Sequence, residues 1–242
     1  MGVPKLFHSL IQQYHHNDVS NPTGYYIIRR DIDNGLPIHL YFDFNSAVYQ
    51  VLKPEIKTEE ALIIHVVAYL DSLCNAIGAD RCALVYIALD GVPPMGKIHQ
   101  QRIRRFHSIC RGNRLKKINE LYGGLDGSGA GSGSSGAGSG SSGACEIDTN
   151  MITPGTAFMH SLGLAIKKYL LERRGAASGA GARTKYIFSD SSIPGEGEHK
   201  LIHHIREGAR LRVDGTSEER ELYGSEHNTV IYALDNDLIM LA

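Results

Sequence analysis

Long apolar runs are missing from this 242-residue sequence. No stretch approaches the roughly 18 consecutive apolar residues that a membrane-spanning helix needs. Residues 1–6 also lack the apolar core and the small-residue cleavage site of a secretory signal. We therefore expect a protein that neither crosses nor binds a membrane.

Cysteine is scarce, and its spacing is uninformative for disulfide or metal sites. The four cysteines form no CxxC pair and no zinc-type spacing; they are Cys74, Cys82, Cys110 and Cys145. This usage is typical of a reducing compartment. We expect a cytoplasmic protein, with the nucleus as the alternative.

Net charge is also nearly absent, because 25 lysines and arginines face 26 acidic residues. This balance argues against indiscriminate binding of nucleic acid. The charge is unevenly placed, however: residues 97–117 contain eight basic residues and no acid. The sequence therefore predicts a local anion-binding site.

One segment has no apolar side chains beyond alanine. Residues 127–144 are only Gly, Ser and Ala, and the heptapeptide GAGSGSS occurs twice in succession at 129–142, as in an engineered linker. Such a segment cannot offset its ordering entropy and is expected to be a flexible coil. It could be a loop inserted in one domain or a tether between two, and we expect an insertion within a single domain spanning 1–242.

The remaining sequence alternates between helical and strand patterns. Helices are expected at 4–14, 58–77, 97–119 (with a break near Gly112), 156–174 and 198–211, and strands at 38–42, 83–89, 186–189 and 230–234. Each strand is a short, continuous apolar run. This order predicts an α/β fold with a mostly parallel central sheet flanked by helices.

Carboxylates follow all four predicted strands. They are Asp43 after the first strand, Asp90 after the second, Glu196 and Glu198 beyond the third, and Asp235 and Asp237 after the fourth. The carboxyl ends of parallel strands share one edge of a sheet, where open α/β folds bind their ligands. We therefore expect the six acids to converge on one cleft.

Six clustered carboxylates repel one another unless cations compensate them. Hard divalent ions such as Mg²⁺ or Mn²⁺ prefer oxygen ligands. Two such ions about 4 Å apart can clamp the attacking and leaving oxygens of phosphodiester cleavage. The acid pattern thus predicts a metal-dependent nuclease with two ions.

Part of the basic segment is suited to a terminal phosphate. Lys97, Gln101, Arg104 and Arg105 are spaced to share one face of a helix. That helix begins soon after Asp90, so its amino end should lie near the acids. Guanidinium groups bind phosphate oxygens bidentately, which favours a 5′-phosphate pocket here.

Several segments resemble the eukaryotic 5′→3′ exoribonuclease (XRN) family, in family order across nearly the whole chain. They are residues 1–7 (MGVPKLF), 41–45 (YFDFN), 86–94 (YIALDGVPP), 100–106 (QQRIRRF), 152–156 (ITPGT), 194–200 (PGEGEHK) and 234–241 (LDNDLIML). The resemblance implies a PIN/flap-endonuclease-like nuclease fold. It also implies Mg²⁺-dependent removal of nucleotides from single-stranded RNA that carries a 5′-monophosphate.

The resemblance further implies roles for individual residues. It assigns the six acids to metal binding and catalysis, and Lys97, Gln101, Arg104 and Arg105 to the 5′-phosphate pocket. Asn45 and Tyr49 are implied RNA contacts; Tyr49 stands where the family usually has a histidine that stacks on the 5′-terminal base. Tyrosine can also stack, so a weaker contact is expected.

The sequence departs from the family at some points. Met95-Gly96 replaces an Arg-Ala-like pair, and the chain stops at Ala242 where the family's catalytic region continues. We therefore expect either a fragment or a truncated relative. Two alternatives stay open: a structure-specific 5′ flap DNA nuclease, and a non-catalytic module that binds RNA 5′ ends. Protein partners and RNA targets are not predicted.

Overall fold

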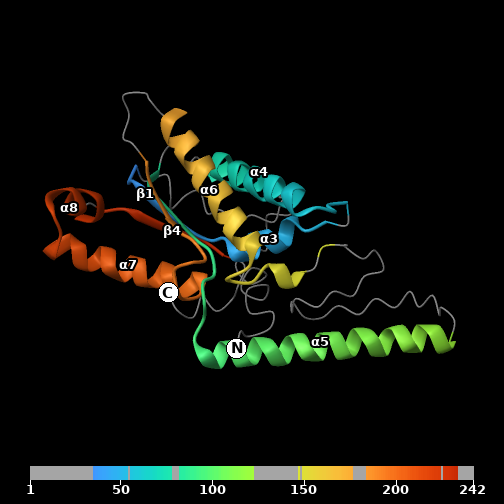
Figure 1. The fold of residues 1–242 in the computed structure, drawn as a ribbon. Helices are drawn as coiled ribbons and strands as arrows, with labels where there is room; N and C mark the ends of the chain where they lie inside the picture. Colours follow the sequence, from blue (N-terminus) through green and yellow to red (C-terminus); the bar gives the residue numbers. More distant parts are fainter. Residues whose placement is uncertain are drawn as a thin grey trace, which may run out of the picture.

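A parallel four-stranded sheet forms the centre of the computed structural model (Figure 1). The structure describes residues 35–53, 55–77, 82–122, 147, 149–176, 184–224 and 226–233. The strands are β1 (Ile38–Asp43), β2 (Cys82–Ala88), β3 (Lys185–Ser189) and β4 (Asn228–Tyr232), in the spatial order β3-β2-β1-β4. Every neighbouring pair is parallel, so all four carboxyl ends lie at one edge.

Helices connect and cover the strands. In chain order they are α3 (Asn45–Val51), α4 (Glu59–Ile77), α5 (Met95–Tyr122), the short 3₁₀ helix η2 (Thr149–Met151), α6 (Ala157–Ala176), α7 (Gly197–Asp214) and α8 (Ser217–Gly224). The expected α/β fold, with a parallel sheet flanked by helices, is confirmed. It agrees with a PIN/flap-endonuclease-like nuclease fold.

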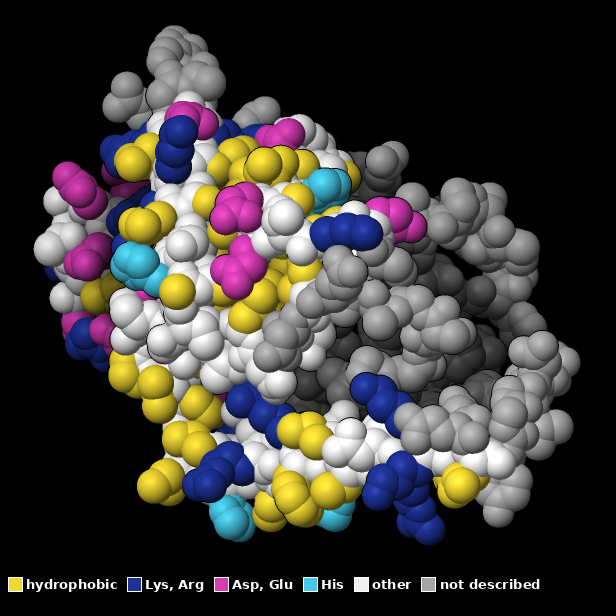
Figure 2. Space-filling view, turned by 45° about the vertical axis from the view of Figure 1, so that its right-hand side comes forward, with side chains coloured by type: hydrophobic (Ala, Val, Ile, Leu, Met, Phe, Trp, Pro, Cys, Tyr) yellow, Lys and Arg dark blue, Asp and Glu magenta, His cyan; other side chains and the backbone are white. Residues whose placement is uncertain are grey.

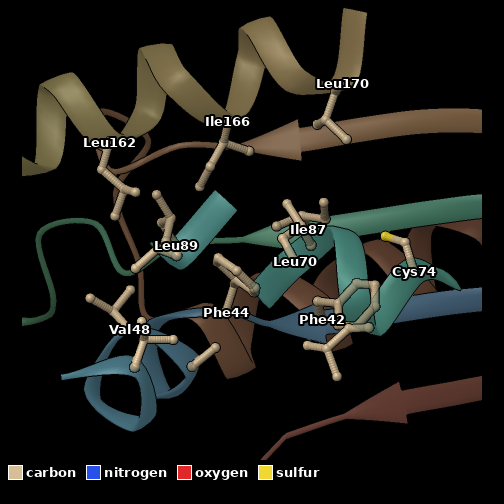
Figure 3. Close-up of a cluster of buried hydrophobic side chains, with 14 of the residues drawn as sticks. Phe42, Phe44, Val48, Leu70, Cys74, Ile87, Leu89, Leu162, Ile166 and Leu170 are labelled. Carbon is tan, nitrogen blue, oxygen red and sulfur yellow. The ribbon is translucent and has the colours of Figure 1, made fainter. Parts of the chain in front are cut away.

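One face of the sheet packs against α3, α4 and α6. Alternate residues of the central strands, such as Phe42 and Ile87, point into this layer and meet Leu70 from α4 and Ile166 from α6 (Figure 3). All four side chains are fully buried. This is the larger core, and it fixes the strand ends that carry the acids.

The opposite face packs against α7 and α8. The intervening strand residues Tyr41, Leu84 and Tyr86 contact a layer that includes Leu201 of α7 and Tyr223 of α8. Burial on both faces explains why the strands read as continuous apolar runs.

The long helix α5 leaves the body of the protein (Figure 1). Residues 102–118 are all exposed, and basic and hydrophobic side chains are mingled along the lower edge of the molecule in Figure 2. The helix continues through Gly112, so the expected break is wrong. A glycine costs a helix only about 1 kcal/mol, which the neighbouring lysines, arginines and leucine can offset.

The other expected elements agree with the structure to within a few residues. Two short helices, α3 and α8, were not predicted, because neither is long enough to show helical periodicity. The expected helix at 4–14 and the Gly/Ser/Ala tract at 127–144 lie outside the described residues.

Candidate functional site

The first residue of α7 lies against two of the predicted acids. The Gly197 amide donates a hydrogen bond to Asp90 Oδ1 over 2.7 Å. A Cβ atom at Gly197 would lie 2.4 Å from Asp43 Oδ1 and 3.4 Å from Asp90 Oδ1. Both carboxylates therefore crowd the amino end of α7, where only glycine fits, and the free amides and dipole of the helix favour negative charge there.

Asn45 orients the other oxygen of the same carboxylate. Its Nδ2 donates to Asp90 Oδ2 over 2.8 Å. Asp90 thus receives one hydrogen bond on each oxygen, from α3 and from α7. The structure places Asn45, which the family resemblance implied as an RNA contact, on Asp90, one of the acids predicted to bind metal.

Two further acids extend from the same helix end. Glu196 immediately precedes α7, Glu198 lies in its first turn, and both are partly buried. Each offers an oxygen within 4.8 Å of the other and of a ring nitrogen of the exposed His199. Four of the six predicted acids, Asp43, Asp90, Glu196 and Glu198, therefore gather at the carboxyl edge of the sheet.

Asp235 and Asp237 lie outside the described residues. Strand β4 ends at Tyr232 beside Phe42 of β1, so the chain heads toward the same edge shortly before Asp235. Their membership of the site stays a prediction.

Burial raises the pKa of Asp90 above its ordinary value. The hydrogen bond from Gly197 opposes this shift, Glu196 reinforces it, and the ammonium groups of Lys200 and Lys97 oppose it. The carboxylates are thus close enough to influence one another, and two lysines supply part of the compensating charge.

Lys97 joins the basic face of α5 to the acids. Its Nζ lies 2.9 Å from Glu196 Oε2, and this hydrogen bond raises the pKa of Lys97. Arg104 lies near enough to act in the opposite direction on the same pKa. The basic helix and the carboxylate cluster are therefore adjacent, as the sequence predicted.

Arg105 connects the basic face of α5 to the segment between η2 and α6. Its Nη2 donates to Thr153 Oγ1 over 2.7 Å, in the loop before α6. Tyr49 of α3 lies close enough to both Arg105 and Asp90 for their charges to act on its pKa, which burial raises. Gln101 lies one helical turn beyond Lys97 and is partly exposed.

Sequence reasoning missed Lys200 and made no prediction for the acid that directly follows β3. Asp190 occupies that position, yet its carboxylate pairs with Lys167 of α6 at 2.9 Å and also binds Ser192. Its hydrogen bonds, first of all from Ser192, lower its pKa to about 2. Lys200 is a buried lysine behind the acids, and only its place in the segment 194–200 could have marked it.

The oxygen atoms that the site offers as ligands suit a hard divalent cation. All four described acids offer carboxylate oxygens, which Mg²⁺ and Mn²⁺ prefer. The absence of a side chain at Gly197 leaves room for the carboxylates of both Asp43 and Asp90 beside the helix end.

No helix among the described residues has the length and apolar character to cross a membrane.

Comparisons with known proteins agree with this arrangement. The family model described as "XRN 5'-3' exonuclease N-terminus" matches residues 1–242. Among curated relatives, proteins named 5'-3' exoribonuclease 2 from Aspergillus fumigatus and Schizosaccharomyces pombe are each 31% identical over 100% of this chain. The protein of that name from Debaryomyces hansenii is 32% identical over the same share.

The chain spans about a quarter of the length of these relatives, from 23% to 24%. The match nevertheless covers every segment on which the fold and the acid cluster depend. The family's nuclease domain is associated with a divalent metal, in keeping with the acidic group at Glu196 and Glu198. The chain belongs to the XRN family of 5′→3′ exonucleases and corresponds to its N-terminal region.

Proposed function

We propose that this chain is the catalytic part of a 5′→3′ exoribonuclease that degrades single-stranded RNA with a 5′-monophosphate. The observation that carries the proposal is the contact between two sites. Four carboxylates meet at the amino end of α7, and Lys97 links them to the basic face of α5 over 2.9 Å. One site suits divalent ions, and the other suits a phosphate.

Asp43, Asp90, Glu196 and Glu198 would hold the metal, with Asp235 and Asp237 completing the set. We propose Mg²⁺ or Mn²⁺, and two ions. When bound, these ions would activate water and stabilise the charge that develops on the phosphodiester oxygens. Asn45 and the Gly197 amide hold Asp90 in one orientation, as outer-shell partners of metal ligands do.

The basic face would bind the 5′ end of the RNA. A single phosphate can be surrounded by Lys97, Gln101, Arg104 and Arg105. Tyr49 of α3, which lies near Arg105, can stack on the terminal base. Fixing the 5′ end beside the acids would place the first phosphodiester at the metal site. This explains why cleavage would begin at the 5′ end and release nucleotides one by one.

Replacing Glu198 by glutamine tests the metal site directly. Glu198→Gln removes a charged ligand at nearly constant size, so Mg²⁺-dependent cleavage of 5′-monophosphorylated RNA should fall by on the order of 10³-fold. Asp235→Asn should do the same. RNA binding in Ca²⁺ should persist, because repulsion between the acids and the RNA decreases.

Glu218→Gln is the matched control, since Glu218 is exposed on α8 beyond the far end of α7. Unchanged turnover in both Glu198→Gln and Asp235→Asn would remove these acids from catalysis. A metal-dependent time course on labelled RNA separates the enzyme from a module that only binds RNA ends. Faster cleavage of flap DNA than of 5′-phosphorylated RNA would favour the flap nuclease.

The expected location is the cytoplasm, with the nucleus as the alternative. Imaging of the tagged protein distinguishes the two compartments.

A further inference from the structure

Lys200 is a buried cation directly behind the acid cluster. It lies in the first turn of α7, and only 7% of its surface is exposed. Its Nζ donates to the Leu89 carbonyl over 2.8 Å and to the Asp190 carbonyl over 2.9 Å. Both acceptors are neutral backbone oxygens, so these hydrogen bonds do not cancel the charge of the ammonium group.

The two carbonyls mark the ends of neighbouring strands. Leu89 follows the last residue of β2 and directly precedes Asp90 in the chain. Asp190 follows the last residue of β3 and begins the loop that leads to Glu196. One ammonium group therefore joins two strand ends to the helix that carries Glu198. Lysine has three donors and no acceptor, which suits it to hold two carbonyls at once.

Backbone hydrogen bonds hold the surrounding loop in place. The Gly91 amide donates to the Gly195 carbonyl over 2.8 Å, and the Gly195 amide donates to the Val92 carbonyl over 3.0 Å. Gly195 has a positive φ of 109° and lies over the Lys200 stem, since a Cβ there would be 3.7 Å from Lys200 Cγ. The loop before Glu196 is thus closed onto the loop after Asp90, with Lys200 beneath it.

The charge of Lys200 acts on the site as well. Lys200 lies close enough to Asp90 and Asp190 for each carboxylate to act on it electrostatically. On the other side of the cluster, Glu196 has an ion pair with Lys97 of α5. Lys200 therefore supplies positive charge from the buried side of the cluster, and Lys97 supplies it from the α5 side.

We infer that Lys200 is a positioning residue for metal binding: it joins the ends of β2 and β3 to α7 and so sets the relative placement of Asp90 and of Glu196 and Glu198. The inference rests on the proposed function, because it concerns the same metal site. The described contacts of the Lys200 ammonium group are with two backbone carbonyls. It acts through the backbone that carries the ligands.

Two readouts in Lys200→Met test this role in the full chain. The first is the ¹H chemical shift of the Gly197 amide in glycine-labelled protein, which reports its hydrogen bond to Asp90. The second is Mn²⁺ affinity by electron paramagnetic resonance. We expect the amide signal to move and the Mn²⁺ dissociation constant to rise by about tenfold or more, the usual effect of losing an outer-shell partner.

Lys167→Met is the matched control. Lys167 contacts the side chain of the same Asp190 at 2.9 Å but is half exposed and lies on α6. This variant should leave the Gly197 signal and Mn²⁺ affinity unchanged. In the active protein, Lys200→Met should lower kcat with little change in KM for RNA, because the basic face of α5 is untouched.

Folded Lys200→Met with an unmoved Gly197 signal and native Mn²⁺ affinity would overturn the inference. If Lys200→Met does not fold, the ¹⁵N signal of the Lys200 ammonium decides in the unmodified chain. It should shift on Mg²⁺ addition while that of Lys167 does not, and no shift at Lys200 overturns the role. Failure of the proposed function is distinct: the unmodified chain would then bind no Mn²⁺, or would bind it without cleaving RNA.

Discussion

The Gly197 amide and the Asp90 carboxylate are joined by a 2.7 Å hydrogen bond that ties the start of α7 to the end of β2. The bond requires close contact between the helix end and the sheet edge. Only a residue without a side chain permits it, because a Cβ atom would meet Asp43 on the other side. The site therefore depends on a glycine as much as on its acids.

Replacing Gly197 by alanine should disrupt the site. The new Cβ would lie 2.4 Å from Asp43 Oδ1, a distance that forces the helix end or the carboxylate to move. We expect weaker Mn²⁺ binding, by about tenfold or more, and a loss of stability of about 1–3 kcal/mol from overpacking. Calorimetric titration and thermal unfolding measure the two effects.

Gly112→Ala is the control for helix propensity. Gly112 lies inside the exposed helix α5, and no atom lies within 4 Å of the place a Cβ would occupy. This variant should gain about 0.5–1 kcal/mol and bind Mn²⁺ normally. Equal Mn²⁺ affinities in the two variants would show that Gly197 does not shape the metal site.

Selectivity for the chemical group at the RNA 5′ end should follow from the few cations on the basic face of α5. If Lys97, Gln101, Arg104 and Arg105 bind the RNA 5′ end as proposed, they suit one phosphate, and a cap adds bulk that such a site would not admit. RNA with a 5′-hydroxyl lacks the phosphate charge that these cations would bind, so it should be held more weakly. Cleavage should be fastest for the monophosphate, slower for the hydroxyl and negligible for capped RNA.

Arg104→Ala probes this ranking. Arg104→Ala should lower the ratio of the cleavage rate of 5′-monophosphorylated RNA to that of 5′-hydroxyl RNA. Its effect on the cleavage rate of 5′-hydroxyl RNA should be smaller. Arg220→Ala, an exposed arginine on α8, serves as the control. Equal rates on monophosphate and hydroxyl RNA in the unmodified protein would make the basic face a general backbone contact.

The sequence predicted the sheet and the acid cluster because both depend on simple patterns. Strands buried on both faces read as apolar runs, and Asp43 and Asp90 follow those runs directly. In a parallel sheet this order alone brings them to one edge. The basic face of α5 was predictable because helical spacing alone brings its residues to one side of the helix.

The contacts that support the acids could not be predicted in this way. Asn45 reaches Asp90, 45 positions away in the chain, and Lys200 reaches the Leu89 carbonyl, 111 positions away. Such contacts depend on how α3 and α7 are placed over the sheet, which no local pattern encodes. Asp190 shows the converse: it follows a strand, yet Lys167 and Ser192 hold its carboxylate.

Shortening the Gly/Ser/Ala tract should have little effect on stability. Residues 127–144 offer no apolar side chains larger than alanine, and loop-closure entropy grows slowly with length, by about 0.6 kcal/mol per doubling. Replacing the tract by a Gly/Ser loop of half the length should change Tm by less than about 5 °C, since 1 kcal/mol shifts Tm by only a few degrees. A larger fall in a thermal melt would mean that the tract packs against the protein.

Acid should destabilise the protein through histidines beneath α7 and α8. His39 of β1 is fully buried, stacks on His227 at 3.7 Å between ring centroids and meets the edge of the Tyr223 ring. Burial, reinforced by His227 and His204, lowers the pKa of His39 from 6.5 to about 4. Burial, reinforced by Lys185 and His203, likewise lowers the pKa of His204 to about 4.

The direction of the effect follows from proton uptake. Between pH 6.5 and about 4 the unfolded chain binds protons that the folded chain excludes, so stability falls as the pH decreases through this window. Each histidine can contribute up to about 1.4 kcal/mol per pH unit.

His39→Phe keeps the ring packing and removes one titrating group, so the loss of unfolding free energy between pH 7 and 5 should shrink by on the order of 1–2 kcal/mol. Urea unfolding at the two pH values measures this difference, and His160→Gln, at an exposed position on α6, should leave it unchanged. If His39→Phe loses as much stability on acidification as the unmodified chain, His39 is not the residue that takes up the proton.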